Sequence, residues 1–170
     1  MLAEWHDFFL LVGTAGATLV ALLFVAASVG TGFLSAEGAL GTRIFMTPVV
    51  IHFAAVFFIS AIALVPALDV KVFAGVIGAA ALVGLGVSAY VTYMVLKTSM
   101  TRDNFDRLAY GLLPAIAYAG ALIAAGLVYA GKEWSLDVLA GALLLLAIVN
   151  IRNGWDLTLS MVRRHARSKK

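Results

Sequence analysis

The histidines are the first side chains to consider, because imidazole is a common ligand of haem iron and of transition metals. His6 precedes the first apolar run, His52 lies inside the second, and His165 lies near the end of the chain. Two axial ligands of one haem must share a depth in the membrane. The spans assigned below separate His6 from His52 by about 20 Å or more. The sequence therefore predicts no haem, no metal site and no other cofactor.

The positions of the carboxylates and the absence of cysteine also argue against a catalytic or metal-binding site. The nine acidic residues fall in loops or near the ends of the apolar runs, and none falls at the expected bilayer midplane. Ion-coupled transporters usually keep an acid at that depth. The absence of cysteine removes thiolate ligands, disulfides and cysteine nucleophiles. We assign no catalytic residue and do not expect an enzyme.

One group of polar residues nevertheless shares a depth near one end of the apolar runs. With a helical rise of about 1.5 Å per residue, four runs place polar or helix-breaking residues in a single layer. The candidates for a polar cavity are His52, Tyr90, Tyr93, Tyr110, Tyr118, Asn150, Arg152, Asn153 and Asp156. Asn150 is the best single candidate, because it is too deep to reach the headgroups and is level with His52.

Simpler interpretations exist for several of these residues. Arg152 and Asp156 are four apart and can pair along one helix while the arginine reaches the headgroups. Tyr90 and Tyr93 fit the aromatic belt at a membrane interface. Tyr118 lies nearer the bilayer middle, so its hydroxyl needs a partner inside the protein.

A second pattern runs along the first apolar segment. Thr14, Thr18 and Ser28 share one narrow helical face, and Gly13 and Gly16 lie near it. One interpretation is a small-residue packing seam whose hydroxyls bond to their own backbone. The other is a stripe that lines a pore.

These residues must be positioned by membrane-spanning helices. The 170 residues are 63% hydrophobic and 12% charged, whereas a soluble domain is about half apolar and a quarter charged. The predicted fold is an all-α, polytopic membrane protein, a bundle of five transmembrane helices. The expected spans are about 8–29, 44–65, 72–96, 108–130 and 136–155, within one transmembrane domain of residues 1–163.

The basic residues predict the orientation. With the C-terminus in the cytoplasm, ten lysines and arginines lie inside and only Lys71 and Lys132 lie outside. We therefore expect the N-terminus outside, in a bacterial-type inner (plasma) membrane. Residues 164–170 form a basic cytoplasmic tail suited to anionic lipid headgroups. The basic charge is explained by topology, so no nucleic acid is expected.

Two prolines and one ridge of small residues give further expectations. Pro48 suits the first turn of the second span after Thr47 as N-cap, but would kink a helix that begins near residue 43. Pro114 removes the donor for the carbonyl of Tyr110 and bends the fourth span. Gly84, Ser88 and Thr92 form a small-xxx-small ridge that predicts close helix packing.

The functional hypothesis is a small homo-oligomeric membrane protein, channel-like or solute-conducting, with a cytoplasm-facing polar cavity. The alternative is a non-catalytic accessory or assembly subunit of a larger membrane complex. A third hypothesis is an enzyme or lipid-binding protein that uses His52. Membrane lipids and either a second copy or another membrane protein are the expected partners.

Overall fold

The computed structural model describes the backbone of residues 1–31, 36–98 and 108–168, and the side chains of residues 1–28, 46–97 and 109–159. In these ranges the chain is helical, with short turns. The elements are η1 (Leu2–Trp5), α1 (His6–Thr31), α2 (Ala36–Ala63), α3 (Val70–Thr98), the π-helical turn η2 (Leu108–Leu112), α5 (Leu113–Tyr129) and α6 (Ser135–Ser168). Five segments of the described chain are long and apolar enough to cross a membrane. The predicted class, a multi-pass helical membrane protein, is confirmed.

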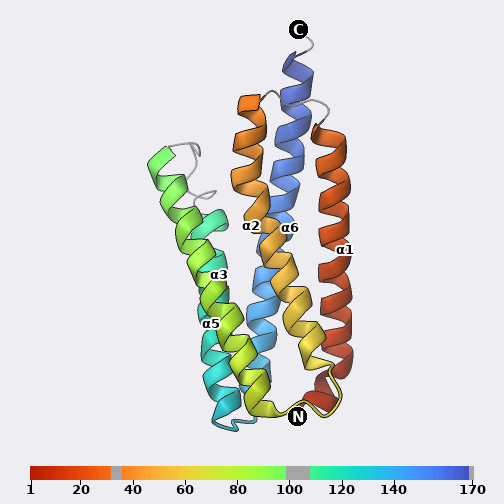
Figure 1. Ribbon diagram of the computed structural model, residues 1–170, viewed down its shortest axis with the longest axis vertical. Coiled ribbons are helices and arrows are strands. Elements are labelled where there is room, and N and C mark those ends of the chain that lie inside the picture. Colours follow the sequence, from red (N-terminus) through yellow and green to blue (C-terminus); the bar gives the residue numbers. More distant parts are fainter. Residues whose placement is uncertain (32–35, 99–107, 169–170) are drawn as a thin grey trace.

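The helices form an elongated bundle in which α2 and α6 lie side by side at the centre (Figure 1). Helix α1 packs on one side of this pair, mainly against α2, and the α3–α5 pair packs on the other. The start of the chain and the end of α6 lie at opposite ends of the bundle (Figure 1). We call these the N-terminal end and the C-terminal end.

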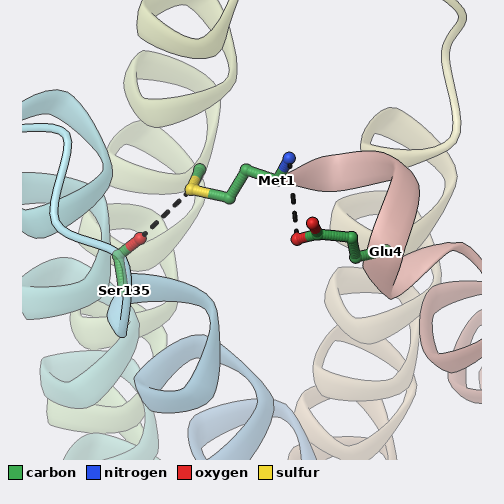
Figure 2. A network of polar contacts seen from close by, with 3 residues as sticks. All are labelled: Met1, Glu4 and Ser135. Atoms are coloured by element: carbon green, nitrogen blue, oxygen red, sulfur yellow. Dashed lines mark hydrogen bonds and ion pairs between the residues drawn. The ribbon is translucent and has the colours of Figure 1, made fainter.

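The connections at the N-terminal end are closed by local hydrogen bonds. Asp69 caps α3, since its Oδ1 accepts from the backbone N–H groups of Lys71 at 2.8 Å and Val72 at 3.1 Å. Gly131, with φ of 68°, ends α5 in the left-handed conformation that glycine tolerates. Figure 2 shows the N-terminal residue lying across this end, with its amino group 3.8 Å from Glu4 and its sulfur 3.8 Å from the Ser135 hydroxyl.

Two glycines allow neighbouring helices to approach closely. A Cβ at Gly16 of α1 would lie 3.2 Å from the backbone of Phe53 and of Phe57 in α2. A Cβ at Gly84 of α3 would overlap the ring of Tyr118, which fills that place. The close packing predicted for the ridge on α3 is confirmed at two of its residues, because Gly84 meets Tyr118 of α5 and Thr92 meets Gly111 of η2.

The buried apolar side chains form two clusters. The larger one fills the N-terminal half of the bundle and includes Phe9, Ile59, Phe73 and Leu139. The smaller one fills the C-terminal half, around Phe53. Of the residues in the expected polar layer, Tyr110 belongs to the smaller cluster and Tyr118 to the larger one.

The helix boundaries differ from expectation at two places. Helix α2 already begins at Ala36, so Pro48 lies inside it and Thr47 is not its N-cap. The fourth span begins with the π-helical turn η2, directly before Pro114. Helix α6 continues to Ser168, while the side chains of the basic tail 164–170 are outside the described residues.

The contact between Gly84 and Tyr118 gives a paired test of this packing. Gly84→Ala places a methyl group into the tyrosine ring, and we expect a loss of about 1–3 kcal/mol in unfolding free energy. Gly86→Ala on the same helix meets open space and should be neutral or slightly stabilising. The measurement is reversible unfolding in mixed micelles. Equal stability of the two variants would contradict this packing.

Candidate functional site

The nine residues of the expected polar layer fall into separate groups. Tyr110, Arg152, Asn153 and Asp156 form one network between η2 and α6. His52 and Tyr118 form a buried pair between α2 and α5. The remaining three residues do not join either group: Asn150, Tyr90 and Tyr93.

The network between η2 and α6 is centred on Asn153, which is almost fully buried. Its Nδ2 donates to the Ala109 carbonyl at 3.0 Å, and its Oδ1 accepts from Nη1 of Arg152 at 3.2 Å. The Tyr110 hydroxyl lies 3.1 Å from the Asn153 carbonyl and 3.2 Å from Oδ2 of Asp156. The Arg152 guanidinium lies 5.9 Å from the Tyr110 ring centre, within range of a cation–π interaction.

This network compensates for Pro114. In a π-helical turn the backbone N–H bonds to the carbonyl five residues earlier, and the residue five after Ala109 is Pro114, which has no N–H. The Asn153 amide supplies a donor to that carbonyl. The side-chain bond thus goes to Ala109 and not to Tyr110, whose carbonyl the sequence singled out, because the turn is π-helical and not α-helical.

The second group is the pair of His52 and Tyr118. The Tyr118 hydroxyl lies 2.8 Å from Nδ1 of His52, and both residues are 1% exposed. The partner that the sequence requires for Tyr118 is thus His52. The second ring nitrogen of His52, Nε2, is buried and has no hydrogen-bond partner among the described residues. The pair therefore keeps one unused polar group inside the bundle.

A lateral groove of about 480 Å³ lies between α2 and α3 and reaches Tyr118. Its lining is otherwise apolar and includes Ile51, Phe58, Val83 and Gly84. The Tyr118 hydroxyl is already engaged with His52. This groove therefore offers an apolar surface.

Asn150 lies apart from both groups and is fully buried. Its Nδ2 donates to the Leu146 carbonyl of its own helix at 2.6 Å, while its Oδ1 has no partner among the described residues. Asn150 and Phe53, the neighbour of His52 in the chain, line one groove between α1 and α6. Asn150 and His52 take part in different contacts.

Two further buried polar groups were not recognised as such from the sequence. The hydroxyls of Ser60 and Ser88 are buried without a partner in the described structure. Ser60 contacts Gly13 at the α1–α2 interface, and no sequence pattern singles it out. Ser88 belongs to the packing ridge of α3, and only its position between Gly84 and Thr92 indicated that it would be buried.

The other predicted residues lie on the surface of the bundle. Tyr90 and Tyr93 are exposed on α3, with Nζ of Lys97 5.6 Å from the Tyr93 ring centre, so they do not line the interior. On α1, the face carrying Thr14, Thr18 and Ser28 is exposed. The hydroxyl of Thr18 donates to the Thr14 carbonyl, and that of Ser28 to the Phe24 carbonyl, each at 2.8 Å.

No protein-family model, curated protein or solved structure matches the chain. Among the described residues, no three histidine, aspartate or glutamate side chains gather where they could hold a metal ion. What the arrangement offers chemically is hydrogen bonding inside an apolar bundle, through His52, Tyr118 and Asn150.

The buried pair can be tested by a double-mutant cycle. Tyr118→Phe leaves Nδ1 of His52 without its partner and should lower stability by about 1 kcal/mol. Replacing both residues, as Tyr118→Phe with His52→Leu, should cost less than the sum of the single changes, because no buried polar group is left unpaired.

Tyr129→Phe is the matched control, because Tyr129 is an exposed tyrosine on the same helix and its loss of a hydroxyl should change little. Unfolding in mixed micelles measures all four variants. Strict additivity of the two changes at the buried pair would show that the two residues are not coupled.

Proposed function

We propose that this protein is a non-catalytic, self-associating membrane subunit, and that two copies meet through the exposed face of α1. The observation that carries the proposal is the composition of that face. It consists mainly of small and hydroxyl-bearing residues, and these residues are exposed in the described structure: Thr14, Thr18, Ala21 and Val25.

The physics of helix association in lipid supports this proposal. Lipid tails are as apolar as leucine, so helices associate through close packing, and small residues gather where two helices meet. The first span has the smallest buried share of the five and lies at the edge of the bundle (Figure 1). Its glycine face already packs on α2, which leaves the threonine face for a partner helix.

Solute conduction is the second candidate, and the hydroxyls on the same face favour it. The described interior of one chain is packed with apolar side chains such as Phe9, Ile59 and Leu139, of which none is more than 1% exposed. Because the interior of one chain is packed in this way, a conducting path between two copies is better supported than a path through a single chain. An accessory role in a larger complex uses the same face with a different partner.

The orientation completes the proposal. By the spans expected from the sequence, ten lysines and arginines fall on the side of the C-terminus and two on the side of the N-terminus, which supports a cytoplasmic C-terminus. The basic tail would then contact anionic headgroups of the inner leaflet of a bacterial-type membrane.

Disulfide cross-linking tests the association directly, since the chain has no cysteine of its own. Thr18→Cys should form a product of two chains, each of 17.9 kDa, when native membranes are oxidised. Ala119→Cys on α5 is the control, being exposed at a similar depth. By helical rise Thr18 lies about 18 Å from the first residue of α1, and Ala119 lies about 15 Å from the last residue of α5. Both of these helix termini are at the N-terminal end of the bundle (Figure 1).

The mass of the product separates the alternatives. A product of another mass at position 18 would favour an accessory subunit over self-association. Equal cross-linking at the two positions, or none, would count against association through α1. Conduction further requires that liposomes containing the cross-linked pair pass small solutes faster than liposomes containing the Ala119→Cys protein.

A further inference from the structure

A second groove, distinct from the exposed face of α1, lies between α1 and α6 and has a volume of about 260 Å³. Phe53 of α2 forms part of it, and Leu22, Ile151 and Trp155 are lining residues that are themselves exposed at the surface of the bundle. The groove therefore opens sideways, toward the lipid that surrounds a membrane-embedded bundle.

Two polar side chains line this groove, and each already donates one hydrogen bond to the backbone of its own helix. Asn150 donates through Nδ2 to the Leu146 carbonyl, and Thr158 donates through its hydroxyl to the Gly154 carbonyl at 2.9 Å. The acceptor side of Asn150 is different, because its Oδ1 is buried and has no partner within the described part of the chain. One residue that lines the groove thus keeps a buried hydrogen-bond acceptor without a donor from the described residues.

We propose that this groove binds a membrane-soluble phenol or alcohol whose hydroxyl donates to Oδ1 of Asn150. An unpaired acceptor buried in an apolar region is unfavourable, and a ligand hydroxyl would remove that penalty. A ketone, an ether or an ester carries no proton to donate. The site should therefore discriminate between a hydroxyl compound and the same compound with its hydroxyl blocked.

The depth of Asn150 and the lack of charge narrow the ligand class. Asn150 lies 15 residues after Ser135 and nine before Leu159, about 22 and 13 Å along the helix, so it sits well inside the hydrocarbon region. The lining residues include none with a charge, so a phosphate or carboxylate headgroup would find no counter-ion. A neutral hydroxyl attached directly to an apolar body fits both conditions.

The volume of the groove and its aromatic lining favour a ring. An apolar cavity of about 150 Å³ is enough to bind benzene. The groove is larger, and Phe53 and Trp155 contribute aromatic surface to it. One substituted ring and the start of an alkyl chain fit this space, while the rest of the chain extends through the open side into lipid.

Quenching of Trp155 fluorescence provides the test, because Trp155 lines the groove. Trp5→Phe and Trp134→Phe leave it as the single tryptophan of the full chain. The probes are a ring-brominated 4-alkylphenol and its methyl ether, titrated into nanodiscs that contain this protein. The phenol should quench at about five-fold lower mole fraction, the ratio expected for one net hydrogen bond.

Two variants and one control locate the effect. Asn150→Leu removes the acceptor, and both probes should then quench alike. Gly154→Leu fills the groove, since a Cβ there already lies 3.5 Å from the Leu23 side chain, and quenching by both probes should fall. Gly141→Leu on the same helix meets open space and should bind as the parent does.

The two probes are compared on the parent protein, whose groove is unchanged. This comparison therefore tests the proposal even where a variant folds poorly. Equal quenching by phenol and ether in the parent would overturn the proposal and indicate an unselective groove for lipid tails. Persistence of the phenol preference in a folded Asn150→Leu protein would overturn it as well. Neither result depends on whether α1 mediates self-association.

Discussion

The hydrocarbon region of a membrane offers no water, so each backbone N–H and C=O within it must find a partner inside the protein. Pro114 conflicts with this constraint, because it removes one donor from a membrane-spanning helix. The π-helical turn η2 precedes it, and Asn153 of α6 donates to the Ala109 carbonyl that this register leaves without a backbone N–H. Tyr110 of the same turn bonds to α6 and lies beside Arg152. The contacts between η2 and α6 therefore surround the place where Pro114 lacks a backbone N–H.

This requirement divides the polar residues of the C-terminal half by their use. Asn153 and Tyr110 are committed to holding the turn, and Asp156 accepts from the latter. His52 and Asn150 are different, because each keeps a buried polar atom without a partner in the described structure. An unpaired polar atom in an apolar surrounding raises the free energy of the folded protein. A protein retains such an atom most readily where a ligand or a partner forms a hydrogen bond with it. The unpaired polar atoms therefore lie outside the structural network, and one of them, on Asn150, is where we propose that a ligand binds.

The sequence contains enough information for the class of fold, because hydropathy and the length of an apolar run are local properties. It also places His52 and Asn150 at one depth, since helical rise converts residue number into height. It does not contain the rotation of one helix relative to its neighbours. Tyr90 and Tyr93 share the expected depth but are exposed on α3, whereas Tyr118 is buried against His52. The start of α2 was also missed, since Thr47 before Pro48 imitates a helix N-terminus.

The central claim is that Asn153 provides the hydrogen-bond donor that Pro114 lacks, and a double-mutant cycle tests it most directly. Asn153→Ala should cost about 1 kcal/mol of unfolding free energy in the parent protein, as a buried interhelical hydrogen bond does. In a Pro114→Ala protein, whose position 114 again carries an N–H, the same change should cost clearly less. An equal cost of Asn153→Ala in both backgrounds would contradict the claim, because the asparagine would then act independently of the proline.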